Sequence, residues 1–217
     1  RQAGPGGWER RDSNAALYYE RGELKGLYSK VHLVPFTEHF PYRDLMPWFH
    51  DFLTANDVHF WEAGNAWTVF DLAEVRIGTP ICFEDTFGYI GRAFTLAGSD
   101  VLVNLTNDSW SGSRSSMRQH LAMAVFRTVE NRRSMVRSTN GGWTAAIDPN
   151  GKLLSELEPM TTGWLSARVP LVPRLQISLY TRWGDYLGWV MSVVSALFFV
   201  YLFVLRLTKG RGWATMV

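Results

Sequence analysis

The sequence predicts a layered α/β domain that is followed by one apolar helix long enough to cross a membrane. Short apolar runs alternate with longer segments at helical spacing, which is typical of a sheet covered by helices. Residues 187–205 read LGWVMSVVSALFFVYLFVL, without a charge, a proline or an amide side chain. A chain of 217 residues is long enough for one domain to bury a substantial core.

The expected elements follow one another in the order of such a domain. The turn-like Glu20-Arg21-Gly22 joins two extended runs, which predicts a hairpin. Asp148-Pro149-Asn150-Gly151 contains the Asn-Gly signal of a tight turn. The expected extended segments are 15–19, 24–28, 67–72, 75–82, 100–105, 134–138, 144–147 and 152–157, the expected helices are 87–97 and 116–133, and residues 163–169 are expected to close the domain.

The apolar run near the C-terminus has the composition of a membrane span. A helix needs roughly 20 apolar residues to cross the hydrocarbon, and this run shows no polar stripe. Trp189 and Tyr201 near its ends suit the two membrane interfaces. The tail beyond it contains Arg206, Lys209 and Arg211. This basic excess predicts a cytoplasmic tail at 206–217 and an exported domain at 1–180.

The charge balance argues against a nucleic-acid partner. The sequence has 22 basic and 20 acidic side chains, and no basic stripe interleaved with aromatic residues. The five histidines lack a spacing typical of metal ligands, so we expect no metal and no cofactor. The single cysteine, Cys82, cannot form a disulfide within the chain, and taken alone it is most simply a small buried apolar residue.

The surroundings of Cys82 favour a reactive thiol instead. It ends an expected strand and precedes a turn into a helix, near helix N-terminal amides, which lower the pKa of a thiol. A lysine close by would favour the thiolate and could stabilise an oxyanion during acyl transfer. Glu38 and Glu84 could carry protons or act as structural partners of that lysine. The segments concerned are YSKVHLVPFTEHFP, PICFED and NLTNDSW.

These segments resemble the nitrilase superfamily, and within it the apolipoprotein N-acyltransferases. KVHLVPFTEHFP is similar to the family's lysine motif and ICFED to its nucleophile motif. NLTNDSW, Gln119-His120 and RTVENRRSMVRSTNGG follow in the family's order, and the match runs over roughly residues 28–205. The resemblance implies a nitrilase-like αββα sandwich followed by a C-terminal transmembrane helix, with a Glu–Lys–Cys catalytic set.

By position, the resemblance implies that Cys82 is the nucleophile and Lys30 the catalytic lysine. It implies acidic residues around the thiol at Glu38 and Glu84, and side chains lining the site at Phe83 and Trp110. Two positions, Ser111 and Trp143, depart from the family pattern and leave the shape of the acyl or amine pocket open. The aromatic residues in or beside the motifs could line a dry, lipid-facing pocket: Phe36, Phe40, Phe83, Phe87 and Trp110.

The family's general-base glutamate lies well upstream of the lysine motif. Glu9, Glu20 and Glu23 are too close to Lys30 and lack the Pro-Glu context of that residue. The chain also begins at Arg1 without an initiator methionine. We therefore expect the C-terminal part of a longer, multi-pass protein, which is inactive by itself.

The resemblance implies a ping-pong reaction at the exported face of the bacterial inner membrane. Cys82 takes an acyl chain from a phospholipid, and the thioester passes it to the N-terminal amine of a diacylglyceryl-cysteine apolipoprotein. Two alternatives stay open, because one fold can serve unrelated functions. They are a membrane-tethered amidohydrolase, in which water resolves the thioester, and a non-catalytic lipid- or lipoprotein-binding module.

Overall fold

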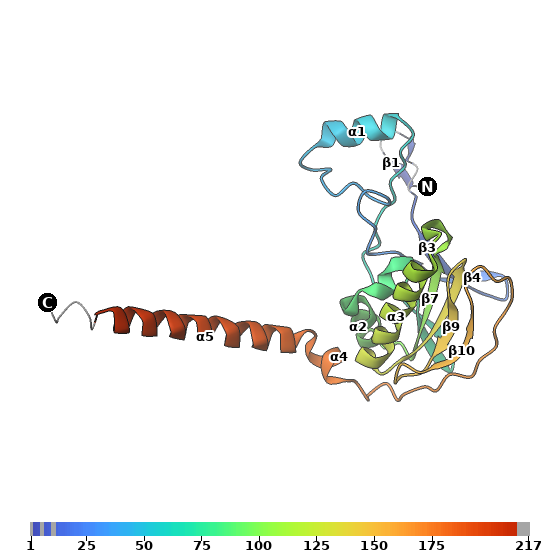
Figure 1. Ribbon diagram of the computed structural model, residues 1–217. Coiled ribbons are helices and arrows are strands. Elements are labelled where there is room, and N and C mark those ends of the chain that lie inside the picture. Colours follow the sequence, from blue (N-terminus) through green and yellow to red (C-terminus); the bar gives the residue numbers. More distant parts are fainter. Residues whose placement is uncertain (1, 5–6, 10–11, 212–217) are drawn as a thin grey trace. The chain divides into compact units, whose positions relative to one another are not determined.

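The computed structural model describes the chain except residues 1, 5–6, 10–11 and 212–217 (Figure 1). It describes side chains for residues 12–208. The chain divides into two compact units, Arg1–Thr181 and Arg182–Val217.

A six-stranded sheet is the centre of the first unit. Strands β6, β7 and β8 are parallel, whereas β5, β9 and β10 pair antiparallel with their neighbours. The parallel strands bring their carboxyl ends to one edge, and the segments that follow β6 and β7 hold Cys82 and Trp110. The sheet order is β10 (Leu153–Leu157), β9 (Thr144–Ile147), β8 (Ser134–Asn140), β7 (Val101–Asn107), β6 (Val75–Gly78) and β5 (Val69–Leu72).

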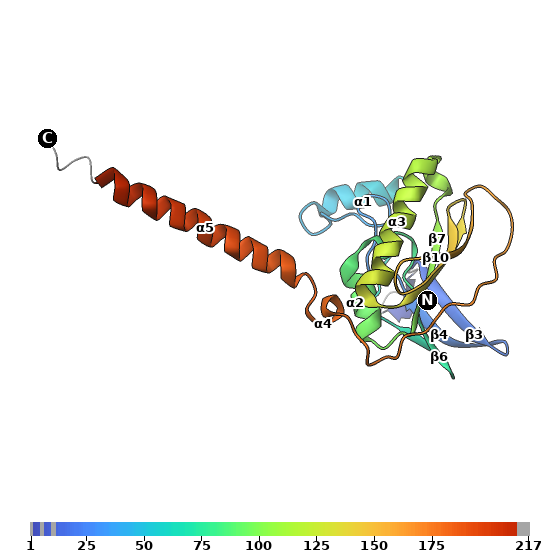
Figure 2. The same cartoon turned by 60° about the horizontal axis from the view of Figure 1, so that its bottom comes forward.

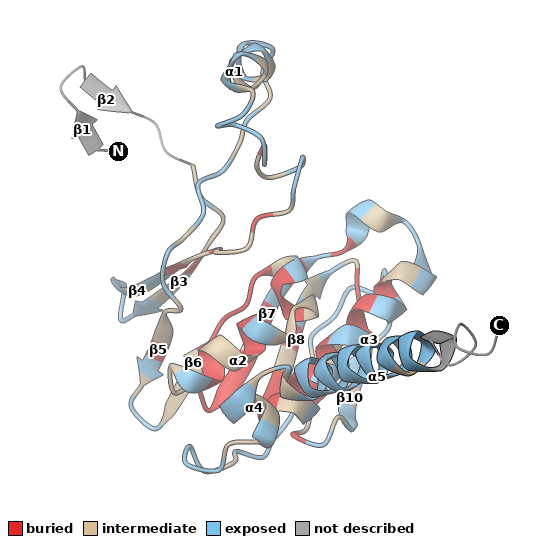
Figure 3. Cartoon of the chain, turned by 90° about the vertical axis from the view of Figure 1, so that its left-hand side faces the viewer, coloured by how far each residue is buried: buried red, intermediate tan, exposed pale blue. Residues whose placement is uncertain are grey.

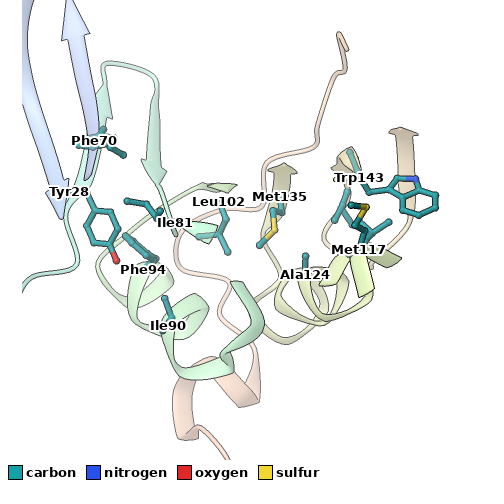
Figure 4. Packing of buried hydrophobic residues seen from close by; sticks show 14 residues of the cluster. Tyr28, Phe70, Ile81, Ile90, Phe94, Leu102, Met117, Ala124, Met135 and Trp143 are labelled. Carbon is teal, nitrogen blue, oxygen red and sulfur yellow. The ribbon is translucent and has the colours of Figure 1, made fainter. Parts of the chain in front are cut away.

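Two helices, α2 (Gly88–Leu96) and α3 (Arg114–Asn131), cover one face of this sheet (Figure 3). Figure 2 shows the same helices beside the strands from a second direction. The core lies between the helices and the strands, where Phe94 and Ala124 pack with Leu102 and Met135 (Figure 4), and Ile147 belongs to the same cluster. All five side chains are fully buried. Burial of this apolar area is the main force that holds the helices to the sheet.

The termini of α3 explain its length. The Ser113 hydroxyl accepts a hydrogen bond from the Ser116 amide at 3.4 Å, which caps the first turn. Arg132 ends the helix in the left-handed conformation, with φ of 53°. The predicted helix at 116–133 is therefore confirmed within two residues at each end.

Two hairpins and a helix precede the sheet. Strands β1 (Gln2–Gly4) and β2 (Gly7–Glu9) pair with each other, as do β3 (Ala15–Glu20) and β4 (Glu23–Ser29). The β3–β4 turn at Arg21 and Gly22 has positive φ at both residues, as a tight hairpin turn requires. Helix α1 (Pro47–Ala55) contains no buried residue. Sequence reasoning missed α1, because its apolar residues face solvent and give no core-facing pattern.

The predicted layered α/β fold is confirmed. In the described residues, α2 and α3 form a helical layer on the six-stranded sheet. The strand expected at 75–82 was partly wrong, because β6 ends at Gly78 and Pro80 cannot donate to the ladder. A single bridge joins Ile81 to Leu105, and the 3₁₀ helix η1 (Cys82–Thr86) then begins. The closing segment at 163–169 forms neither helix nor strand.

The second unit consists mainly of α5 (Tyr186–Arg211), and α4 (Leu179–Trp183) begins just before this unit. In the described part of the chain, Tyr186–Thr208 is the one helical stretch that is long and apolar enough to cross a membrane. None of the apolar window in that stretch is buried within the structure.

Candidate active site

Cys82 is the first residue of η1, at the strained turn that follows β6. Its φ of 52° is in the left-handed region, which residues other than glycine rarely adopt. Such backbone conformations are enriched at functional sites. The side-chain amide of Asn104 on β7 donates to the carbonyl of Cys82 at 3.0 Å and to that of Pro80 at 3.2 Å. These bonds stabilise the turn and hold the half-buried Cys82 in place.

A cavity of about 740 Å³ opens beside Cys82. Four of the predicted site residues, Cys82, Glu38, Phe83 and Trp110, line it. The other lining residues are Asn14, Ala15, Val34, Thr37, Trp61, Ile81, Leu105, Thr106 and Asn107. Of the five aromatic residues expected in the pocket, Phe36, Phe40 and Phe87 do not line this cavity, and sequence reasoning missed Trp61.

Lys30 and Glu38 form an ion pair, and of the two only Glu38 lines this cavity. The Lys30 side chain is fully buried, and its Nζ lies 2.8 and 2.7 Å from the two carboxylate oxygens of Glu38. The amide of Val34 donates to the same carboxylate at 2.8 Å. A buried ammonium requires such a partner, because desolvation without one is costly.

Glu84 joins the lysine segment to the nucleophile segment. Its buried carboxylate accepts hydrogen bonds from the amides of Val31 and His32, both at 2.9 Å. It also accepts from the amide of Ile81 at 2.8 Å and from the Tyr28 hydroxyl at 2.9 Å. Burial raises the pKa of Glu84, and these hydrogen bonds oppose the rise. One carboxylate thus ties the residue after Lys30 to the residue before Cys82.

A second buried group of side chains, the ionic cluster, consists of Asp85, Asp108, His120 and Arg137. His120 Nε2 lies 2.6 Å from Asp85 Oδ1, and His120 Nδ1 lies 2.9 Å from Asp108 Oδ1. Arg137 Nε lies 3.1 Å from Asp85 Oδ2. The same Nε lies 3.4 Å from the Asn104 side-chain oxygen. Through Asn104, the ionic cluster is connected to the turn that holds Cys82.

Sequence reasoning gave no role to the ionic cluster. Its members come from η1, from the segment after β7, from α3 and from β8, so their proximity is set by the fold. A signal was available in the strands themselves. Asn104 and Arg137 are polar residues that take buried positions in otherwise apolar strands, and buried polar groups need partners.

Burial opposes a charge on His120, but the hydrogen bonds to Asp108 and Asp85 outweigh burial and raise the pKa of His120 to about 9. Unfolding returns that pKa to about 6.5. The cluster therefore stabilises the fold fully below about pH 6.5, and this contribution is lost as the pH rises through 9.

We expect the unfolding temperature of the full-length protein to fall between pH 7 and pH 10, from a loss of roughly 3 kcal/mol at this site. His120→Gln cannot titrate, so its unfolding temperature should be lower at pH 7 and should fall less over the same range. Thermal unfolding of both proteins across this range measures the difference. Parallel curves for the two proteins would show that His120 is not protonated in the fold.

The two positions that depart from the family pattern lie outside the cavity lining. Trp143 is buried in the core cluster, and the guanidinium groups of Arg114 and Arg118 lie 5.8 and 5.4 Å from its ring centre. The Ser111 hydroxyl donates to the carbonyl of Asp108 at 3.1 Å. The shape of the cavity at Cys82 does not depend on contact with either side chain.

Comparison with known proteins identifies the family of this chain. Residues 13–173 match the family model of the carbon-nitrogen hydrolases. The chain is 46% identical to apolipoprotein N-acyltransferase 1 of Treponema pallidum, over 96% of this chain and 39% of that protein. It is also 46% identical to the protein of the same name from Treponema denticola, over 84% of this chain and 34% of that protein. The chain thus spans about two fifths or less of the length of these relatives.

A solved structure shows the same fold. The crystal structure of a carbon-nitrogen hydrolase from Helicobacter pylori G27 superimposes with a TM-score of 0.51 at 13% identity. The match covers 67% of this chain and 52% of that one. The fold agrees with the match over residues 13–173, and that match shows that the chain belongs to the carbon-nitrogen hydrolase family.

Proposed function

We propose that this chain is the nucleophile-bearing part of an apolipoprotein N-acyltransferase. It moves an acyl chain from a phospholipid through a Cys82 thioester to the N-terminal amine of a diacylglyceryl-cysteine apolipoprotein. The observation that carries the proposal is the strained Cys82 turn at a cavity that Glu38 also lines, with Lys30 buried behind Glu38 and paired with it. Similarity to relatives named apolipoprotein N-acyltransferase supports this class of reaction.

In the first half-reaction, the Cys82 thiolate attacks the ester carbonyl of the phospholipid. The tetrahedral oxyanion collapses, the C–O bond breaks, and the lysophospholipid alkoxide takes up the proton that the Cys82 thiol lost on forming the thiolate. In the second, the acceptor amine attacks the thioester, loses a proton and expels the thiolate. A thiolate suits both steps, because it attacks an ester well and is expelled readily by an amine.

We assign Lys30 the role of holding positive charge near the thiolate and the oxyanion, with Glu38 keeping the ammonium in position. Glu84 is better suited to positioning than to proton transfer, because its oxygens already accept three backbone amides and a hydroxyl. Phe83 and Trp110 supply apolar walls for the acyl chain.

That the chain alone is inactive stays a prediction. Incubating the isolated chain with phospholipid, and looking for an acyl adduct on Cys82 by mass spectrometry, checks it.

The competing amidohydrolase differs only in what resolves the thioester. An apolar cavity that excludes water protects a thioester from hydrolysis, so we expect the acyl-enzyme to persist in buffer. We expect it to discharge at least about tenfold faster when a diacylglyceryl-cysteine peptide is added. The measurement is mass spectrometry of the purified full-length acyl-enzyme over time, with and without the peptide. Rapid decay that the peptide does not accelerate would identify a hydrolase.

The basic residues in the last turns of α5 support a topology. We propose that Arg206, Lys209 and Arg211 keep the tail in the cytoplasm, which places Cys82 on the exported side of the inner membrane. In spheroplasts, a membrane-impermeant thiol reagent should label a cysteine introduced at Asp185 and not one introduced at Thr215. Labelling at Thr215 alone would show the reverse orientation.

A further inference from the structure

A second cavity, of about 510 Å³, adjoins the cavity at Cys82. Trp61 lines both cavities, so a single side chain forms part of the boundary between them. Apolar and aromatic groups, among them Leu33, Phe40 and Phe60, make up much of the second wall. The remaining wall residues include His32, His39, Arg43 and His50. No aspartate or glutamate among the described residues lines this cavity.

The nitrogen groups in this second cavity are not fully used by the protein. Nδ1 of His39 is buried and has no hydrogen-bond partner among the described residues. The exposed Arg43 forms no ion pair within the described part of the chain. His50 is paired only with Asp51, at 3.3 Å, and that carboxylate is 81% exposed. A guanidinium without an ion pair and a buried imidazole nitrogen without a partner, in a cavity without acids, suit an anionic ligand.

The electrostatic environment agrees with this geometry. Burial lowers the pKa of His32, and the positive charges of Lys30 and His39 lower it further, against an opposing effect of Glu38. Glu38 is already bound to Lys30. His32 Nδ1 lies 2.5 Å from the Tyr89 hydroxyl, which fixes the orientation of its ring. The positive potential from Lys30 that lowers the pKa of His32 favours a negatively charged ligand at the same place.

We infer that this second cavity binds the phosphate of the phospholipid donor, with Arg43 and His39 as its main contacts. The inference rests on the proposed function, which identifies the donor. A glycerophospholipid joins its acyl ester to its phosphate through the glycerol backbone alone. The ester carbonyl can therefore lie at Cys82 while the phosphate lies beyond Trp61, in the adjoining cavity. The aromatic wall then covers the glycerol and the base of the acyl chains.

This assignment gives the two half-reactions different requirements. The donor brings a phosphate, whereas diacylglyceryl-cysteine has none. Acylation of Cys82 should therefore depend on Arg43 and His39, and discharge of the thioester to the acceptor should not. A purely structural role for these residues would affect both steps alike.

The test measures the rate of Cys82 acylation in the full-length protein with phosphatidylglycerol and with diacylglycerol of the same chains. Arg43→Gln with His39→Gln should slow acylation by phosphatidylglycerol at least about tenfold, since charge-assisted bonds to phosphate are lost. Acylation by diacylglycerol and discharge to a diacylglyceryl-cysteine peptide should not change. Lys152→Gln is the matched control, because it removes an exposed cation that precedes the edge strand β10 and lines neither cavity.

Equal losses with both donors, or slower discharge, would overturn the inference, as would no loss with phosphatidylglycerol. In a further contrary outcome, inorganic phosphate protects Arg43 from chemical modification while the variants acylate equally well with phosphatidylglycerol and with diacylglycerol. That result would identify free phosphate as the ligand of this cavity. If the double variant does not fold, the same rates are measured with Arg43→Gln alone, which should fold because Arg43 is exposed. Failure of the proposed function itself is distinct, because the wild type would then form no adduct with any lipid.

Discussion

Cys82→Ala in the full-length protein should lower acyl transfer by at least about 10³-fold, since no second nucleophile replaces the thiolate. Cys82→Ser should be equally inactive, because a hydroxyl has a far higher pKa than a thiol and is the weaker nucleophile. The fold should survive both changes. Asn104 binds the backbone carbonyl of residue 82, and that contact does not depend on the side chain.

The measurement is conversion of diacylglyceryl-cysteine peptide to its N-acylated form, with the unfolding temperature of each variant as a control. Retained transfer in Cys82→Ala, in a protein of normal stability, would mean that Cys82 is a structural residue. The strained φ of 52° would then have another cause.

Lys30→Ala should lower formation of the acyl-enzyme by about 10²–10³-fold, the usual effect of removing one group that stabilises an oxyanion. Lys30→Arg should not restore it, because the planar guanidinium places its donors differently from a compact ammonium. Normal acylation in Lys30→Arg would mean that this position supplies only diffuse positive charge. Lys30→Ala also leaves the Glu38 carboxylate without its partner and should destabilise the fold.

A double variant separates these two effects. Lys30→Met with Glu38→Gln replaces the ion pair by neutral side chains of similar size, which is often neutral for stability. It should unfold near the wild-type temperature and still form no acyl-enzyme. A stable double variant with normal acylation would exclude the ion pair from the chemistry.

The strands and the position of the nucleophile were largely predictable from the sequence. The largely apolar start of β7 reads as a buried strand, and both β7 and β8 were found within two residues of their ends. The change from strand to turn at Cys82 was also found, although Pro80 ends β6 earlier than expected. Local pattern sufficed because each of these features is determined by neighbouring residues.

Contacts between distant segments could not be predicted in this way. Glu84 binds amides at Val31 and His32, more than 50 positions away in the chain. The sequence left its role open between proton carrier and structural partner, and the hydrogen bonds favour positioning. The contacts of His120 with Asp85 and Asp108 likewise required the packing of α3 against the sheet.

The central claim is that Cys82 forms the acyl thioester, and peptide mapping of the acylated protein tests it most directly. The full-length wild type is incubated with a phospholipid that has isotopically labelled acyl chains, digested and analysed by mass spectrometry. The labelled chain should be on the peptide that contains Cys82, and hydroxylamine should release it. A labelled chain on another residue, with Cys82 unmodified, would contradict the account.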